Sequence, residues 1–187
     1  MKDNIKVIGI DDGYFLKHKT KRVMIIGAVM RGNTELEGVV SSHVTKDGTD
    51  ATSSIVKMIN DSRHKNQLRF IMVNGLTFGG FNVLDIRKVN EKTRLPVISV
   101  IRKRPDFRRI ENALANFSDG KKRLAVLKKA GDIYSHKRIY FQIAGLSEER
   151  AREVIDKTLR NSNIPEPIRM AHLIASGVTY GESTKRA

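Results

Sequence analysis

The sequence predicts an α/β fold in which helices flank a mixed sheet. Three observations support this prediction. Segments rich in Val and Ile come first, strand-like and helical patterns then alternate along the chain, and no linker, repeat or low-complexity segment divides the 187 residues. A chain of this length is within the usual range of one domain. We therefore expect a single domain over residues 1–187.

The first three strands are expected at residues 5–11, 22–31 and 36–44, where β-branched residues are frequent. Residues 31–33, Arg-Gly-Asn, supply a tight turn between the second strand and the third. Because consecutive strands joined by short connections pair with one another, these segments predict an antiparallel β-meander.

A helix should follow the meander and cover it. Asp50 or Thr52 can cap its first turn, and apolar residues then recur at the spacing of one helical face. These apolar residues are Ile55, Val56, Met58 and Ile59. A fourth strand is expected at 68–73, where a continuous apolar run indicates burial on both faces, and Asn74 with Gly75 ends it.

The second half of the chain alternates between helices and strands. After a flexible turn at 79–80, Asn82 is the expected cap of a helix through Val89. Pro96 precedes a strand, and Pro105 suits the first turn of a helix. The further expected elements are a strand at 97–101, a helix through Phe117, a basic helix at 121–130, a strand at 137–143, a helix from Ser147 through Leu159 and a last helix from Pro165 to about Ala175.

The composition indicates an anionic partner. The chain has 35 Lys and Arg against 20 Asp and Glu, which gives a formal net charge of +15, and its pI is about 10.2. Such a surface attracts polyanions, nucleic acid first and an anionic membrane second, although a basic surface can also simply face solvent.

The chain contains no Cys, which excludes disulfides, zinc fingers and thiolate metal sites. Any metal must therefore be held by oxygen or imidazole ligands. The apolar run near the N-terminus is too short for a signal sequence or a membrane span. We expect a cytoplasmic protein that does not enter a membrane.

Two adjacent carboxylates end the first expected strand. In Val-Ile-Gly-Ile-Asp-Asp-Gly at 7–13, the apolar run stops at Asp11 and Asp12, where residues at the carboxyl edge of a sheet carry function. Phosphodiester hydrolysis needs hard cations, which prefer oxygen ligands. Because neighbours on a strand point to opposite faces, we assign a metal to Asp11 and interpret Asp12 as a turn residue that binds backbone.

The order of the expected elements is that of the ribonuclease H-like fold. Near the other end of the chain, residues 164–172 read Ile-Pro-Glu-Pro-Ile-Arg-Met-Ala-His. With the stretch at 7–13, the Asn-Gly-Leu-Thr-Phe-Gly-Gly-Phe-Asn segment at 74–82 and Gly-Glu-Ser at 181–183, they make the chain resemble the archaeal endonuclease dU family over nearly its whole length. The chain resembles the endonuclease V nucleases more distantly.

The likeness to endonuclease V implies a set of metal ligands. It places Asp11 on the first metal-binding aspartate and Asp50 roughly on a glutamate, although Asp47 competes for the second place. An N-cap role alone would also explain Asp50. Asn74 stands where endonuclease V has an aspartate ligand, and an amide oxygen can coordinate a cation but brings no charge. Asp85, on the following helix, is an alternative source of charge.

The remaining candidates follow from the same likeness. Arg102 falls near a catalytic lysine of endonuclease V, and with Lys103 and Arg104 it could clamp phosphate or form a solvated basic turn. His172 could be a metal ligand, an acid or a structural residue. Phe78, beside glycines, could stack on a base or belong to the core.

The resemblance implies a Mg²⁺- or Mn²⁺-dependent endonuclease of DNA repair that acts on damaged or deaminated nucleic acid, with DNA expected rather than RNA. Asp11 and Asp50 would hold the cations, Arg102 would clamp phosphate and His172 would assist. The second hypothesis is a nucleic-acid-binding protein on the same fold that has lost cleavage, and Asn74 favours it. The apolar wedge with which endonuclease V parts two strands has no counterpart at residues 44–49. The lesion, the cleavage position and the oligomeric state stay open.

Overall fold

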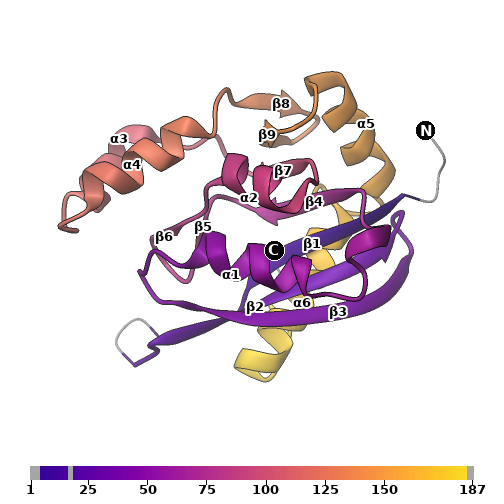
Figure 1. The fold of residues 1–187 in the computed structure, drawn as a ribbon, viewed down its shortest axis with the longest axis horizontal. Coiled ribbons are helices and arrows are strands. Elements are labelled where there is room, and N and C mark those ends of the chain that lie inside the picture. The colour runs from indigo at the N-terminus through magenta and orange to yellow at the C-terminus, as the bar shows by residue number, and fades with distance from the viewer. Residues whose placement is uncertain (1–4, 17–18, 185–187) are drawn as a thin grey trace.

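A computed structural model describes residues 5–16 and 19–184. Its centre is a seven-stranded sheet in the order β3-β2-β1-β4-β7-β9-β8 (Figure 1). The strands of this sheet are β1 (Lys6–Asp12), β2 (Arg22–Arg31), β3 (Glu35–Thr45), β4 (Phe70–Asn74), β7 (Val97–Ile101), β8 (Tyr134–His136) and β9 (Ile139–Ala144). The helices are α1 (Ala51–Asn60), α2 (Ile86–Thr93), α3 (Phe107–Leu114), α4 (Gly120–Lys129), α5 (Glu148–Thr158) and α6 (Glu166–Tyr180), with a 3₁₀ turn at Lys65–Gln67.

Strand pairing confirms the predicted meander. β1 pairs antiparallel with β2, and β2 pairs antiparallel with β3. β4 and β7 then add in parallel to β1. β9 pairs antiparallel with β7, and β8 pairs antiparallel with β9 and forms the edge. Because β1, β4 and β7 are parallel, residues that follow all three strands gather at one edge of the sheet.

Helices cover both faces of the sheet, as Figure 1 shows with α1 and α2 in front and α5 and α6 behind. A hydrophobic cluster lies on each face of the sheet, and alternate side chains of β1 belong to one cluster or the other. Ile8 and Ile10 belong to a cluster with Ile55 of α1, whereas Val7 belongs to a cluster with Val154 of α5. Odd-numbered positions of β1 therefore face α5 and α6, and even-numbered positions face α1 and α2.

The structure corrects the expected start of the second helix. The side chain of Asp85, not Asn82, caps α2 by accepting a hydrogen bond from the backbone N–H of Lys88 at 3.0 Å. Asn82 lies in a two-stranded ribbon formed by β5 (Thr77–Phe78) and β6 (Asn82–Val83). Its buried amide accepts from the backbone N–H of Ala51 at 2.9 Å, so a contact distant in sequence determines its position.

Three other boundaries differ from the prediction. Lys137, expected to begin a strand, has a positive φ of 52° in the turn between β8 and β9, and β8 itself was not predicted. The helix that follows Pro105 ends at Leu114 instead of reaching Phe117. α6 continues to Tyr180, beyond the expected end near Ala175. Within the described ranges 5–16 and 19–184, no helix has the length and apolar character needed to cross a membrane.

Candidate functional site

Three side chains from three elements meet at the carboxyl edge of the sheet. The amide nitrogen Nδ2 of Asn74, at the end of β4, donates to Oδ2 of Asp11 on β1 at 3.1 Å. Nδ1 of His172, on α6, lies 2.8 Å from the same carboxylate oxygen. The other oxygen of Asp11 accepts from the backbone N–H of Asp12 at 3.0 Å. Asp11 is only 3% exposed, so these polar contacts are what stabilise its carboxylate away from water.

Two glycines of the first strand segment allow α6 to pack directly on the strand. A Cβ built on Gly9 would clash with the backbone carbonyl group of Pro167, and one on Gly13 would lie 2.6 Å from a methyl carbon of Thr179. Positions 9, 11 and 13 share one face of the extended chain, so the two contacts flank Asp11. The two sequence motifs at opposite ends of the chain therefore form a single packed unit.

The residues at the start of α6 are structural. Glu166 is buried, and its Oε2 lies 2.7 Å from Nη2 and 2.8 Å from Nε of Arg169, one turn later in the helix. This charge-assisted pair satisfies the carboxylate within its own helix. Of the matching segment at 164–172, His172 is the residue that reaches Asp11.

His172 is held from both sides. Its Nε2 lies 2.8 Å from Oγ1 of Thr184. The chain leaves α6 at Gly181, whose φ of 96° allows a sharp reversal, and the backbone N–H of Thr184 then donates to Oγ of Ser176 at 3.3 Å. An ionised carboxylate can only accept a hydrogen bond, so we place a ring proton on Nδ1, which faces Oδ2 of Asp11.

Asp12 faces the opposite side of the sheet from Asp11. Its Oδ2 accepts from the backbone N–H of Gly79 at 2.5 Å, so it anchors the loop after β5 instead of its own turn. Burial, and then repulsion from the Asp11 carboxylate, raises the pKa of Asp12 to about 6 from an ordinary value of 3.8. The two adjacent carboxylates thus form an acidic, poorly solvated edge.

Asp50 does not join this cluster. Its carboxylate accepts from the backbone N–H of Thr45 at 3.0 Å, from the hydroxyl of Thr45 at 2.8 Å and from Nδ2 of Asn82 at 2.6 Å. Burial alone would raise the pKa of Asp50, but these hydrogen bonds outweigh burial and lower it below its usual value. The described contacts of Asp50 tie the end of β3 to α1, and its side chain makes no capping hydrogen bond to the helix.

The alternative acidic residues also have structural partners. Oδ1 of Asp47 accepts from the backbone N–H of Phe81 at 2.9 Å, and Oδ2 of Asp85 lies 2.8 Å from Nζ of Lys129. Among the residues that the structure describes, no three His, Asp or Glu side chains gather as a metal site would require. On the side of the sheet that faces His172, the oxygen-bearing side chains of the cluster are the Asp11 carboxylate and the Asn74 amide, since Asp12 faces the other side. One carboxylate carries too little charge for two Mg²⁺, and the Asn74 amide, which donates to Asp11 here, would have to turn its oxygen outward to help hold one.

A basic segment lies beside the cluster. Arg102, Lys103 and Arg104 follow β7 directly and are all exposed. Because Asn74 pairs with Val100 across the parallel strands, this segment begins two residues beyond the row of Asn74. The structure therefore brings the basic segment to the same sheet edge as Asp11, as the sequence predicted.

The prediction that Phe78 stacks on a base is wrong. Its ring is fully buried in the core beside α1 and cannot reach a ligand. The backbone next to Phe78 lies close to the core, because a Cβ at Gly79 would be 3.1–3.2 Å from the side chains of Val23 and Val44. The ring of Phe78 therefore stabilises the fold.

A pocket of about 210 Å³, which we did not predict, opens at Gly75, on the α1 and α2 side of the sheet, whereas the Asn74 side chain is on the α6 side. Apolar side chains form most of its wall, and Gly75 lies at its rim. Its buried polar groups are Ser99 of β7 and Gln142 of β9, which are cross-strand partners. The sequence feature that could have indicated this pocket is a polar residue, Ser99 or Gln142, inside each of two otherwise apolar strands.

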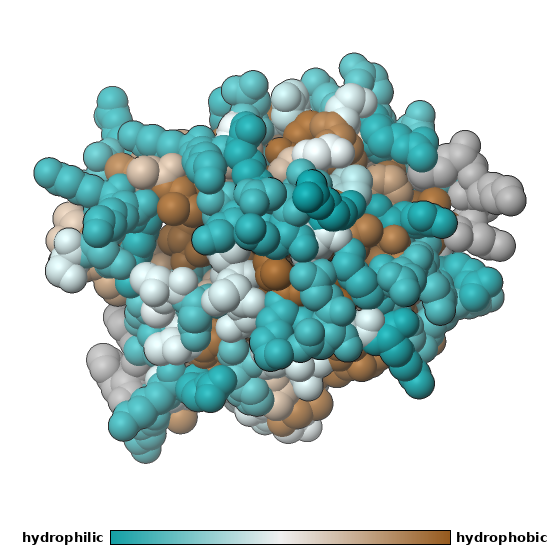
Figure 2. Space-filling view, in the orientation of Figure 1, coloured by the Kyte–Doolittle hydropathy of each residue, from teal (hydrophilic) through white to brown (hydrophobic). Residues whose placement is uncertain are grey.

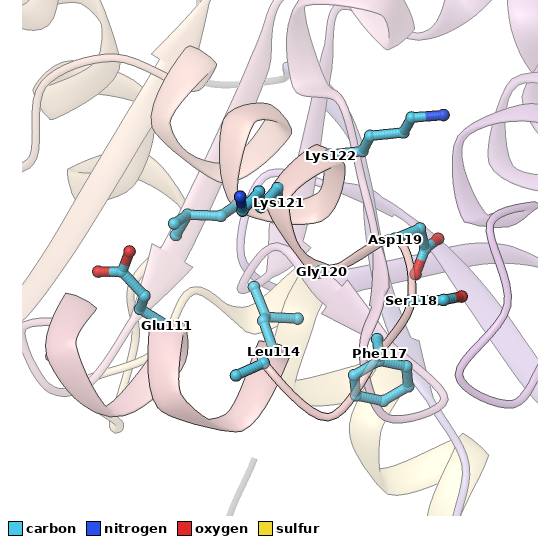
Figure 3. A pocket seen from close by; sticks show the side chains of 10 residues that line it. Glu111, Leu114, Phe117, Ser118, Asp119, Gly120, Lys121 and Lys122 are labelled. Atoms are coloured by element: carbon cyan, nitrogen blue, oxygen red, sulfur yellow. The ribbon is translucent and has the colours of Figure 1, made fainter.

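A second pocket of about 830 Å³ lies between α3 and α4 (Figure 3). Leu114 and Phe117 form its apolar part, and Glu111, Lys121 and Lys122 lie around it (Figure 3). None of the predicted site residues lines it. Figure 2 shows hydrophilic side chains over most of the face that carries α1 and α2, in keeping with the basic composition.

Comparisons with known proteins agree with this architecture. A UPF0215 protein of Methanopyrus kandleri is 46% identical over 193 residues, which cover 100% of this chain and 98% of that protein. The crystal structure of a protein of unknown function from Archaeoglobus fulgidus superposes with a TM-score of 0.89 at 33% identity, covering 95% of this chain and 99% of that chain.

More distant likeness identifies the fold. Endonuclease V of Ciona intestinalis, in complex with a 24-mer DNA that contains an inosine followed by a ribo-adenosine, superposes with a TM-score of 0.59 at 14% identity, over 92% of this chain and 84% of that chain. With the sheet order, this likeness confirms the predicted ribonuclease H-like fold. A family model described as Endonuclease dU matches residues 3–179, and the chain belongs to this family.

Proposed function

We propose that the protein is a divalent-cation-dependent endonuclease that cleaves DNA at a damaged or deaminated base. One observation carries the proposal: Asp11, Asn74 and His172 converge at the carboxyl ends of two adjacent parallel strands, with a basic segment following the next strand. Oxygen ligands beside cationic side chains are the groups that phosphodiester hydrolysis requires.

Each residue then has a role that its contacts support. Asp11 and the amide oxygen of Asn74 would hold one Mg²⁺ or Mn²⁺, which supplies stabilisation of charge on the reacting phosphate oxygens. His172 orients the Asp11 carboxylate through the 2.8 Å contact. Arg102 and its neighbour Lys103 neutralise the phosphate backbone from the adjacent strand.

The pocket at Gly75, which lies across the sheet from the Asn74 side chain, is the candidate site for a base that leaves the helical stack. It is apolar with the buried polar groups of Ser99 and Gln142, as expected of a site that receives a flipped base. The family description, Endonuclease dU, and the inosine-containing DNA bound by the Ciona endonuclease V favour a deaminated base. DNA is the proposed polymer.

A second function, nucleic-acid binding without cleavage, is favoured by one observation. The neutral amide of Asn74 donates to Asp11, so a single described carboxylate carries the charge of this cluster. Weak cation binding would follow, because each missing carboxylate removes attraction for Mg²⁺.

Cleavage of labelled duplexes separates the two functions. The parent chain and Asp11→Asn are incubated with duplexes that contain one deoxyuridine, one deoxyinosine or neither, in Mg²⁺, Mn²⁺ or EDTA. If the protein is an endonuclease, we expect a nick near the altered base that requires the cation and is absent in Asp11→Asn. Binding of all three duplexes with no nick in either cation would establish the binding protein instead.

A further inference from the structure

Two exposed tyrosines form a pair at the end of the Asp11 strand. Tyr14 follows β1, Tyr180 ends α6, and their ring centroids lie 4.9 Å apart with the rings inclined at 62°. Tyr14 is 47% exposed and Tyr180 is 53% exposed. Two adjoining aromatic rings, each about half exposed, offer a flat apolar surface that a partner can contact.

The pair is held in place by the same packing that forms the site. The backbone N–H of Tyr14 donates to Oγ1 of Thr179 at 2.7 Å, which fixes the chain after β1 to the last turn of α6. Gly13 makes this approach possible, because any Cβ there would meet Thr179. An edge-to-face pair leaves ring faces open, so another flat ring can stack on it.

The pair lies within a few nucleotides of the Asp11 site. Tyr14 is three residues beyond Asp11 on an extended chain, a span of about 10 Å at roughly 3.3 Å per residue. Tyr180 is eight residues beyond His172 on a helix, a span of about 12 Å at 1.5 Å per residue. These spans equal about three to four nucleotide steps of 3.4 Å.

The positive charge near Tyr14 and Tyr180 favours an anionic partner for the tyrosine pair. Lys19, Lys21 and Arg22 are exposed in the segment that follows Tyr14, and the whole chain carries a formal charge of +15. A second copy of the chain would bring like charges together at this surface, whereas a polyanion would be attracted to it.

We propose that Tyr14 and Tyr180 form a stacking platform for an unpaired nucleobase of the strand that crosses the Asp11 site. The proposal rests on the nucleic-acid partner of the proposed function and specifies its substrate: a single strand, or a duplex opened near the altered base. Aromatic rings stack on bases without regard to sequence, so the platform selects unpaired strands and not a lesion.

Binding to two matched strands tests the platform. Fluorescence anisotropy in EDTA measures the affinity for a labelled single-stranded DNA 12-mer and for a 12-mer of the same length in which every base is replaced by an abasic site. We expect the parent chain to prefer the strand with bases. Tyr14→Ala and Tyr180→Ala should each weaken binding of that strand about tenfold, or about 1.4 kcal/mol, because each variant removes a ring on which a base stacks.

The controls make the result specific to stacking. Tyr14→Phe and Tyr180→Phe keep the ring and should retain parent affinity, and Leu36→Ala removes a 46% exposed side chain from the edge strand β3 and should change nothing. Affinity for the abasic strand, and its dependence on salt, should be the same in all variants, because no phosphate contact is lost.

Three outcomes would overturn the platform. Unchanged affinity in the alanine variants would overturn it while leaving the proposed function intact, and so would equal weakening toward both strands. Sedimentation that shows a dimer in the parent and a monomer in the double alanine variant would identify the pair as a contact between copies. If the parent bound neither strand at low salt, the platform would fail, whereas the proposed function would fail only if the labelled duplexes were also neither bound nor nicked.

Discussion

Nδ1 of His172 lies 2.8 Å from Oδ2 of Asp11, and this contact joins the last helix to the first strand across 161 positions of the sequence. Asn74 donates to the same oxygen, so one buried carboxylate organises three elements. Removal of Asn74 or His172 as a donor takes one hydrogen bond from the buried carboxylate of Asp11, which costs more than the loss of a hydrogen bond exposed to water.

Replacing His172 tests this organisation. His172→Ala should lower the free energy of unfolding by about 1–3 kcal/mol, the usual cost of leaving a buried polar group without its partner. His172→Asn places an amide donor where Nδ1 was and should recover much of the loss. Urea denaturation in EDTA measures both variants, and equal losses in the two would show that the hydrogen bond to Asp11 does not matter.

Gly9→Ala tests the packing of α6 on β1. The new Cβ would clash with the carbonyl group of Pro167, which belongs to a helix backbone and cannot rotate away. We expect a loss of about 1–3 kcal/mol or more, as for other overpacked cores. Gly177→Ala on α6 is the matched control, since the nearest atom there is the Ser183 hydroxyl at 3.3 Å. Thermal unfolding should show a lower Tm for Gly9→Ala alone, and a parent-like Tm would contradict the proposed contact.

The raised pKa of Asp12 predicts a particular dependence of stability on pH. Between about pH 4 and 6 the folded protein keeps a proton on Asp12 that the unfolded chain has lost, since the pKa is about 6 in the fold and ordinarily 3.8. The folded state then binds more protons, so the contribution of Asp12 to the free energy of unfolding falls as pH rises through this window.

Asp12→Asn should remove that slope. The neutral amide can still accept from Gly79, so the free energy of unfolding at pH 7 should rise by up to about 3 kcal/mol. Denaturation from pH 4 to 7 in EDTA measures the effect, because a bound cation would itself stabilise the charged form. A variant with the same slope as the parent would show that Asp12 does not titrate in this range.

The basic segment after β7 predicts salt-dependent binding. Affinity for duplex DNA should fall steeply with salt, and replacing Arg102, Lys103 and Arg104 together by Ala should flatten the slope by up to about three phosphate contacts. Fluorescence anisotropy from low to moderate salt provides the slope. If the triple variant kept the parent slope, these exposed side chains would only face solvent.

Local patterns predicted most of the fold. The Val- and Ile-rich segments gave the meander, and the positions of Asp11 and Asn74 at strand ends placed them together, which the structure confirms. The proximity of two residues at strand ends can be predicted in this way because the carboxyl ends of parallel strands lie at one edge of a sheet.

Contacts distant in sequence explain what the patterns missed. Asn is a residue type that often caps helices, but the buried amide of Asn82 instead forms hydrogen bonds with the backbone of Ala51 and the carboxylate of Asp50. Phe78 sits between residues typical of a flexible loop, yet its ring is in the core. Asp50 is satisfied by Thr45, and the pairing of Asp50 with Asp11 as metal ligands stays a prediction without a described contact to support it.

Asp11 and Asn74 are proposed to share one cation site. Mn²⁺ affinity, measured by electron paramagnetic resonance of the free ion, tests it in the parent chain, in Asn74→Asp and in Asn74→Asp combined with Asp11→Asn. We expect tighter Mn²⁺ binding and faster nicking in Asn74→Asp, where each tenfold gain in rate corresponds to about 1.4 kcal/mol, and loss of both gains in the double variant. Mn²⁺ affinity and nicking in Asn74→Asp that both equal those of the parent chain would contradict the claim.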